Sequence, residues 1–197
     1  QVLNYVLECI NVKNIIISKL GQESKEYDTF INLAIKQKSK IFYVKKGDLL
    51  RIGKAVIEIL YPNNEIINEN IKNNNSMVFK LTWNNISMLF TGDIEKIAEE
   101  KILTMYKNNI KKLEAKILKI AHHGSKTSST YNFLKAVNPQ IALIGVGKDN
   151  KFGHPNNEII KRLEYFNCRI YRTDESGEIA IKVNKNNISI KTMIGKK

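Results

Sequence analysis

The sequence predicts an α/β fold, because short apolar runs typical of strands alternate with stretches of helical periodicity along most of the chain. The clearest change of period falls at Gly92-Asp93. The residues before it have strand character, whereas Ile94 and Ala98 after it begin one face of a helix. A length of 197 residues with 43% hydrophobic content is enough for one globular domain with a buried core. We therefore expect one domain over residues 1–197, without an internal repeat.

The first third of the chain is expected to alternate between helix and strand. Ile15, Ile16 and Ile17 form a continuous apolar run of the kind found in buried strands. Residues 63–75 are rich in asparagine and poor in core residues, so we expect a mobile surface loop there. The elements expected before that loop are a helix through Cys9, a strand at Val12–Ser18, a helix at Tyr27–Gln37, a strand at Ile41–Val44, and two β stretches within Leu49–Leu60 that Gly53 separates and Pro62 ends.

The remainder of the chain begins with a predicted hairpin. Asn84-Asn85 is expected to form its turn, because asparagine tolerates the positive φ that a tight turn requires. In the helix that follows, Glu95, Glu99 and Glu100 are expected to face outward. The expected elements are strands at Met77–Trp83, Ile86–Thr91, Lys116–Ala121, Gln140–Val146 and Arg169–Arg172, helices at Ile94–Met105, Ser128–Val137 and Asn156–Phe166, and a last hairpin of Glu178–Val183 and Ile188–Met193 around Asn184–Asn187.

Charge and cysteine usage narrow the function classes. The 32 basic residues outnumber the 19 acidic ones, which gives a formal net charge of +13. This charge favours an anionic partner or substrate, or it reflects the lysine- and asparagine-rich composition of an AT-rich coding genome. Cys9 and Cys168 follow no metal-ligand spacing, and we expect both to be buried thiols. No apolar run approaches the roughly 18 to 20 residues that cross a bilayer, so no membrane span is predicted in this chain.

Side chains able to bind metals follow three apolar strands, and all three histidines of the chain lie in two of these places. Active sites of α/β folds gather in loops at the carboxyl ends of strands, so we expect the three places to form one site. Carboxylate and imidazole groups suit Zn or Mn, and a carboxylate can bridge two ions that activate a shared water. The three places are Leu89–Asp93, Ile120–Ser125, and Ile144–Val146 leading to Gly153–Pro155.

Each candidate also has a purely structural interpretation. Asp93 could cap the helix that follows it. His122 and His123 could be a surface pair, and His154 could be a loop residue that packs on Phe152. The grouping of these residues at strand ends favours the site over the separate structural interpretations.

Three hydroxyl residues, Thr127, Ser128 and Ser129, lie at the start of the helix expected at Ser128–Val137. They are interpreted as capping residues rather than nucleophiles, because no acid–histidine relay is evident for them. The free N–H groups at that helix start could still bind a phosphate.

A family resemblance rests on five segments that occur in this order: Asn75–Val78, Leu89–Asp93, Ile120–Ser129, Gly147–Pro155 and Tyr171–Gly177. Together they resemble the metallo-β-lactamase-fold domain of ComEC-type competence proteins, over roughly residues 1–183 and most closely from Asn75 onward. The resemblance implies a four-layer αββα sandwich with a metal site along one edge of its two sheets. It also implies hydrolysis of phosphodiesters, with DNA as the substrate in DNA-uptake proteins.

The resemblance assigns roles by position. Asp93 resembles the family's bridging carboxylate, and the His122-His123 pair resembles its late histidine ligand. These three residues are therefore the implied metal ligands, with one histidine on the metal and the other supporting it or the substrate. His154 resembles a histidine near the site, as a ligand or a transition-state contact, so all three histidines are catalytic candidates.

Two further residues of the same loop, Lys126 and Ser129, are expected to bind a phosphate oxygen of the substrate. One family element is absent: no residue before Asp93 is a histidine, so the motif His-x-His/Asp-x-Asp-His followed by Gly-Gly is missing. We expect this motif just before Gln1. The domain would then be N-terminally truncated, hold at most half of a two-metal Zn or Mn site, and be inactive by itself.

The resulting hypothesis is a metal-dependent hydrolase domain of a DNA-uptake protein, in which a metal-activated water cleaves a phosphodiester. The parent protein would lie in the cell membrane, with this domain soluble and extracytoplasmic. The first alternative is a stand-alone cytoplasmic or secreted metallohydrolase for another ester, and the second is a non-catalytic basic domain that binds DNA. Truncation would also expose a sheet edge through which the chain could dimerise.

Overall fold

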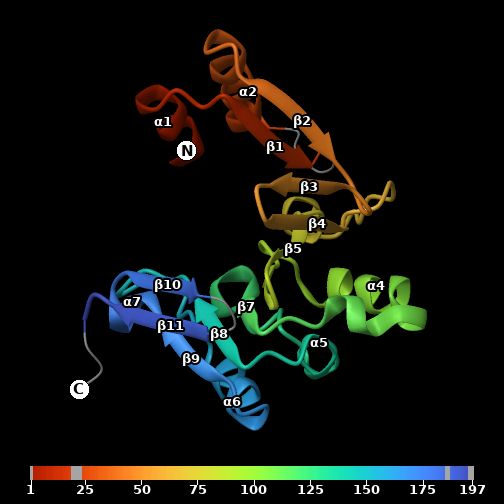
Figure 1. The fold of residues 1–197 in the computed structure, drawn as a ribbon, viewed down its shortest axis with the longest axis vertical. Helices are drawn as coiled ribbons and strands as arrows, with labels where there is room; N and C mark the ends of the chain where they lie inside the picture. The colour runs from red at the N-terminus through yellow and green to blue at the C-terminus, as the bar shows by residue number, and fades with distance from the viewer. Residues whose placement is uncertain (1, 19–23, 185–186, 195–197) are drawn as a thin grey trace.

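A seven-stranded mixed sheet forms the centre of the protein in the computed structural model, which describes residues 2–18, 24–184 and 187–194. Its strands follow one another in sequence order across the sheet (Figure 1). They are β3 (Leu49–Ile52), β4 (Ala55–Tyr61), β5 (Val78–Trp83), β6 (Ile86–Phe90), β7 (Ile117–Lys119), β8 (Ile141–Ile144) and β9 (Arg169–Arg172).

Strand direction changes in the middle of this sheet. Strands β3 to β6 pair antiparallel, whereas β6 to β9 pair parallel. The turn between β5 and β6 is the predicted one, with Asn84 at a φ of 51°. Because β6, β7 and β8 run the same way, the loops that follow them leave from one edge of the sheet.

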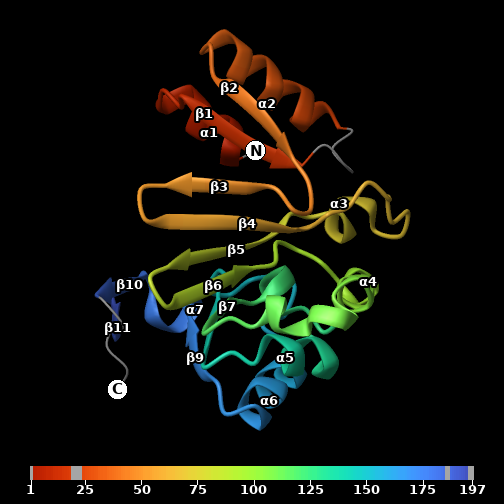
Figure 2. The ribbon, with the colours of Figure 1, turned by 45° about the vertical axis from the view of Figure 1, so that its right-hand side comes forward.

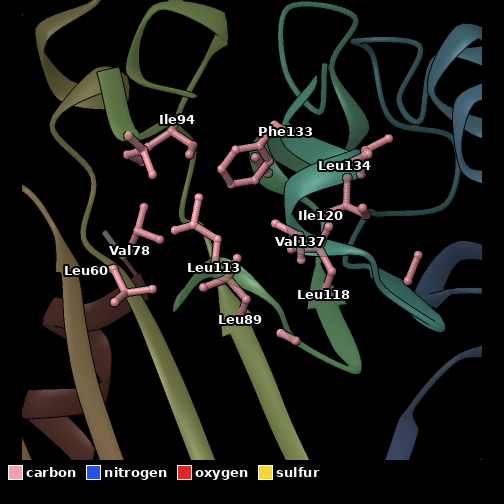
Figure 3. Packing of buried hydrophobic residues seen from close by; sticks show 14 of the residues in the cluster. Leu60, Val78, Leu89, Ile94, Leu113, Leu118, Ile120, Phe133, Leu134 and Val137 are labelled. Atoms are coloured by element: carbon pink, nitrogen blue, oxygen red, sulfur yellow. The ribbon is translucent and has the colours of Figure 1, made fainter. Parts of the chain in front are cut away.

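Helices cover one face of the sheet (Figure 2). These are α4 (Lys96–Met105), α5 (Tyr131–Val137) and α6 (Asn157–Tyr165), with the 3₁₀ segment η1 (Lys107–Leu113) after α4. Alternation along β7 assigns Leu118 to this face and Ile117 to the other. Figure 3 shows how Leu89 and Leu118 from the sheet meet Phe133 and Val137 of α5 in the main core.

A hairpin covers the opposite face. Strands β10 (Ile179–Asn184) and β11 (Asn187–Thr192) pair antiparallel, and their alternate apolar residues pack on Ile117 and Ile141 of the sheet. The short helix α7 (Thr173–Ser176) links β9 to this hairpin. Residues 185–186 of the predicted turn lie outside the described residues.

The N-terminal residues form a small unit of their own beside β3 and β4 (Figure 2). It contains α1 (Val2–Cys9), β1 (Asn14–Ser18), α2 (Lys25–Lys36) and β2 (Lys40–Val44). β1 and β2 pair parallel in a separate sheet, and a separate core surrounds Leu7, Ile15 and Ala34. None of the described helices is both long enough and apolar enough to cross a bilayer.

The strands and helices expected from the sequence are all found, but the expected surface loop at residues 63–75 is wrong in one respect. It ends in a helical turn, α3 (Ile71–Asn74), and buries two asparagines. The Asn74 backbone carbonyl accepts the Tyr61 hydroxyl at 2.8 Å, and the Asn75 side chain bonds both backbone groups of Ile67. Asn74 and Asn75 are therefore buried and hydrogen-bonded, which the polar composition of residues 63–75 did not indicate.

The expectation of two buried thiols is also only half right. Cys168 is buried and donates its thiol hydrogen to the carbonyl of Pro139, whereas Cys9 is exposed at the end of α1. The short helix α1 packs only one face on its neighbours, so the last residue on its other face is left in solvent.

Two of the three glutamates expected to face outward are buried. Glu99 of α4 is 0% exposed, and its carboxylate accepts the backbone N–H groups of Ser129 and Thr130 at the start of α5. Arg162 of α6 donates to the backbone carbonyls of Ser128 and Ser129. Burial raises the pKa of Glu99, while the two N–H groups and Arg162 act against that rise. The carboxylate thus joins α4 to the loop before α5.

Glu99→Ala is expected to lower the free energy of unfolding by about 3 kcal/mol, because it leaves the buried N–H of Ser129 and the partly buried N–H of Thr130 without an acceptor. Chemical denaturation followed by circular dichroism measures this loss. Glu100→Ala is the matched control, because Glu100 is exposed and its carboxylate lies 3.7 Å from the exposed ammonium of Lys96. That change is expected to cost less than about 0.5 kcal/mol. Equal losses for the two variants would contradict a structural role for Glu99.

Candidate functional site

Three loops from the carboxyl ends of β6, β7 and β8 meet at one edge of the sheet, as predicted. The backbone N–H of His122 donates to the carbonyl of Gly92 at 3.1 Å, which joins the first loop to the second. The N–H of Asn156 donates to the carbonyl of Gly124 at 2.9 Å, which joins the second to the third. The loops therefore form one hydrogen-bonded platform for the side chains that they carry.

The second loop has an unusual backbone. Within η2 (Ala121–Gly124), His122 has a φ of 47°, His123 has a φ of 55° and Gly124 has a φ of 84°. A non-glycine residue in this left-handed region costs about 1 to 3 kcal/mol, and such residues cluster at functional sites.

Two glycines allow the loops to approach one another closely. A Cβ on Gly92 would lie 2.7 Å from Cβ of Ser76, and a Cβ on Gly124 would lie 2.6 Å from Cβ of Pro155. The Ser76 hydroxyl also accepts the N–H of Asp93. The segment at Ser76 thus supports the first loop from the neighbouring antiparallel part of the sheet.

Asp93 and His123 face each other across the first two loops. Nε2 of His123 lies 3.9 Å from Oδ1 of Asp93, and both side chains are partly exposed. Nδ1 of His123 lies 2.6 Å from the carbonyl oxygen of Gly145, which can only accept. Nδ1 therefore carries the hydrogen in the neutral ring, which leaves Nε2, 3.9 Å from the carboxylate, with a free lone pair.

His122 faces a buried carboxylate that the sequence did not assign to the site. Its Nδ1 lies 3.3 Å from Oε1 of Glu95 but is buried without a hydrogen bond. Glu95 is only 8% exposed, and it accepts hydrogen bonds from Asn70 at 2.7 Å and from Thr127 at 3.1 Å. The expectation that Glu95 faces outward is therefore wrong, because side chains distant in sequence satisfy its carboxylate.

His154 joins the same group from the third loop. Its ring centroid lies 5.8 Å from that of His122 and 5.9 Å from that of Phe152, on which it stacks. Asn150 holds the loop by bonding both backbone groups of His154. Burial and the two neighbouring histidines lower the pKa of His154, which favours its neutral form. The residue thus packs on Phe152 and also lies beside the candidate ligands.

Lys119, at the end of β7, is a charged group near the site that the sequence analysis missed. Its side chain is partly buried, and the ammonium donates to the backbone carbonyl of Ile120 at 2.9 Å. Burial lowers its pKa, and the charge of Asp93 acts in the opposite direction. A lysine within a buried apolar strand is itself a signal, because lysine is rarely buried without a partner.

The two residues expected to bind phosphate are placed differently. Lys126 lines an open groove next to Glu95. Ser129 is only 2% exposed, with its N–H on Glu99 and its carbonyl on Arg162. The expectation that Thr127, Ser128 and Ser129 cap the following helix is wrong. The N-cap of α5 is Thr130, whose hydroxyl accepts the N–H of Phe133.

The donor set at this edge does not by itself complete a metal site. No cluster of three or more histidine, cysteine, aspartate or glutamate residues able to hold an ion occurs within the described ranges. Asp93 and His123 supply two facing donors, whereas Nδ1 of His122 is directed at Glu95. A zinc site in proteins takes three or four protein ligands, so these residues do not fit a complete site.

No family model matches the chain. It is 32% identical over 168 residues to ComE operon protein 3 of Bacillus subtilis, which covers 85% of this chain and 21% of that protein. The chain is homologous to part of ComEC-type competence proteins. Competence protein ComA of Neisseria gonorrhoeae is 31% identical over 59% of this chain and 16% of its own length.

A third relative, Recombination protein 2 of Haemophilus influenzae, is 29% identical over 68% of this chain and 16% of its own length. The chain thus spans about a fifth or less of the competence-related proteins that it matches.

Two solved structures share the α/β fold of the chain. The diiron β-hydroxylase CmlA of Streptomyces venezuelae superposes on 81% of the chain with a TM-score of 0.50 at 11% identity. A variant of CmlA superposes on the same share with a TM-score of 0.53 at 9% identity.

Gly124→Ala is expected to destabilise the protein by more than Gly53→Ala. Both glycines have positive φ, but a Cβ at Gly53 meets nothing within 4 Å, whereas one at Gly124 would lie 2.6 Å from Pro155. We expect a loss of about 1 kcal/mol at Gly53 and of about 2 to 4 kcal/mol at Gly124. Thermal unfolding of the two variants measures the difference. A similar loss at both positions would contradict close packing between the second and third loops.

Proposed function

We propose that the chain is the catalytic part of a metal-dependent phosphodiesterase that acts on DNA. The observation that carries this proposal is the meeting of Asp93, His122, His123 and His154 at one sheet edge in a homologue of competence proteins. A carboxylate and imidazoles at the carboxyl ends of parallel strands suit hydrolysis better than a purely structural role. Core packing does not require the left-handed backbone of the loop that carries His122 and His123.

The residues of this chain would divide the work. Asp93 and the free Nε2 of His123 would be the two donors to a Zn or Mn ion, whose chemistry is to make water nucleophilic at neutral pH. Further ligands would come from the His-x-His/Asp-x-Asp-His motif that the family resemblance implies. Glu95 would orient His122 as a supporting group, in the way that carboxylates orient imidazoles around metal sites.

Other residues would interact with the leaving oxygen and with the negative charge of the substrate. His154 lies beside His122 and, as a neutral imidazole, would donate its ring N–H as a hydrogen bond to the leaving oxygen of the phosphodiester. Lys126 at the groove and the overall net charge of +13 would attract the polyanionic strand. The parent protein would be a membrane protein of DNA uptake, with this domain outside the cytoplasm.

A second candidate function is supported by the incomplete donor set. A basic domain that binds DNA without cutting it needs no third ligand, and it would show an affinity that falls steeply with salt. A third candidate is a metallohydrolase of another ester with the same fold. The two candidates differ from the main proposal in whether DNA is cut.

The decisive experiment compares this chain with a version extended upstream through the expected histidine-rich motif. Both are assayed for bound metal and for Mn-dependent cleavage of labelled DNA. We expect the longer version to bind about two ions and to cut DNA, and chelation to abolish cleavage. Asp93→Ala should remove both properties, whereas Asp28→Ala on the exposed face of α2 should change neither. DNA binding without cleavage by the longer version would overturn the proposal in favour of a binding module.

We also propose that the chain associates through the edge strand β3. The side chains of Leu49 and Ile52 are more than half exposed on this strand, and its outer edge has no partner strand among the described residues. Sedimentation velocity is expected to show dimers whose fraction rises with concentration, and Ile52→Lys should reduce it. A monomer at all concentrations would contradict this proposal.

A further inference from the structure

We infer that the groove beside His122 binds one unpaired nucleotide of a single-stranded nucleic acid, with its base on Tyr131 and its phosphate on Lys126. The groove has a volume of about 510 Å³ and lies between the starts of α4 and α5. This volume falls within the range of roughly 300 to 1,000 Å³ that is usual for sites of small ligands. The inference deepens the proposed function, since it names the form of DNA that the site would take.

The groove is continuous with the candidate site. Oε1 of Glu95 lies 3.3 Å from Nδ1 of His122 and also accepts the hydroxyl of Thr127 at 3.1 Å. Glu95 and Thr127 both line the groove. The side chain of Glu95 therefore separates the groove from His122. If a phosphodiester of a nucleic acid lay at His122, an adjacent nucleotide of the same strand would lie in the groove.

Lys126 is the cation in this groove that is available to a phosphate. Of the other two, Lys96 lies 3.7 Å from Glu100, and Arg162 is engaged by Glu158 and by backbone carbonyls. Within the described part of the chain, Lys126 makes no ion pair that the structure records. Glu95 has its carboxylate oxygens hydrogen-bonded, which weakens its repulsion of an anion.

Tyr131 offers an aromatic surface held in a fixed orientation. The residue is 51% exposed at the first position of α5. The Arg162 guanidinium lies 5.6 Å from its ring centroid, and the Tyr165 ring packs against it at 5.7 Å and 82°. A ring fixed on two sides loses little freedom when a base stacks on its exposed part.

An aromatic ring beside a cation is the arrangement that proteins use to bind single strands without regard to sequence. Every base has a flat face that can stack, but in a duplex that face is covered by the neighbouring base pairs. The groove therefore favours an unpaired nucleotide over a paired one. The chemistry of Tyr131 and Lys126 thus predicts a preference for strand form rather than for sequence.

The test measures binding alone, by fluorescence anisotropy with a chelator present, so that cleavage plays no part. Three probes of equal length are used: a labelled DNA single strand, the same strand with abasic sites, and the matching duplex. We expect the single strand to bind most tightly. Tyr131→Ala should weaken its binding about tenfold and leave the abasic strand unaffected, because stacking on one aromatic residue is of this order.

Matched variants separate stacking from charge and from folding. Tyr131→Phe should retain the affinity, and Tyr131→Leu should lose it while keeping an apolar side chain against Tyr165. Lys126→Ala should weaken both the normal and the abasic strand. Lys135→Ala at the other end of α5 and Tyr5→Ala on the exposed side of α1 should weaken neither.

The outcomes distinguish this inference from the proposed function. Unchanged single-strand affinity in both Tyr131→Ala and Tyr131→Leu would overturn the inference, as would equal losses on normal and abasic strands. Equal affinity of the wild-type chain for duplex and single strand would do the same. If the stacking pattern holds but the extended chain cuts no DNA, the groove stands and the hydrolase proposal fails.

Discussion

The left-handed turn at His122–Gly124 is the constraint on which the candidate site depends. A left-handed backbone conformation at two non-glycine residues costs free energy, so the turn persists only because contacts with surrounding groups stabilise it. Its first N–H bonds the loop after β6, its last carbonyl accepts from the loop after β8, and the Ser128 hydroxyl reaches back to Ala121 at 3.1 Å. Hydrogen bonds that join all three loops therefore offset the conformational strain of this turn.

Two buried carboxylates extend this support beyond the loops. Glu95 and Glu99 lie one helical turn apart at the start of α4, and each accepts hydrogen bonds from other segments. Glu95 binds Asn70 and Thr127 and faces His122, whereas Glu99 fixes the backbone before α5. The helix α4 thus acts as a rigid anchor, in a basic protein where buried anions also offset nearby positive charge.

The fold could be predicted from the sequence because each strand and helix carries its own periodic signal. Ile117 and Leu118 show why: neighbouring residues of one strand face different cores, and both are apolar, as expected of a strand covered on both faces. The three loops of the site could be predicted because their residues follow strand ends. Local pattern was sufficient for these features, since each depends on residues close together in the sequence.

The features that were missed depend on partners far away in the sequence. Glu95 and Glu99 occupy helix positions that look exposed, but their hydrogen-bond donors come from residues 70 and 127–130. Asn74 looked like part of a polar loop, and it is buried because Tyr61 and the Glu95 backbone bond to it. Burial of a polar residue is decided by distant donors and acceptors, which no local periodicity records.

The separate N-terminal unit has a consequence for how the molecule opens. Its two-stranded sheet and its core around Leu7, Ile15 and Ala34 are small, and in the part of the chain that the structure describes its strands do not pair with the seven-stranded sheet. Amide hydrogens of β1 and β2 would therefore exchange with solvent through a partial opening that needs less free energy than global unfolding. The candidate site lies wholly in the larger unit, so this opening would leave the three loops assembled.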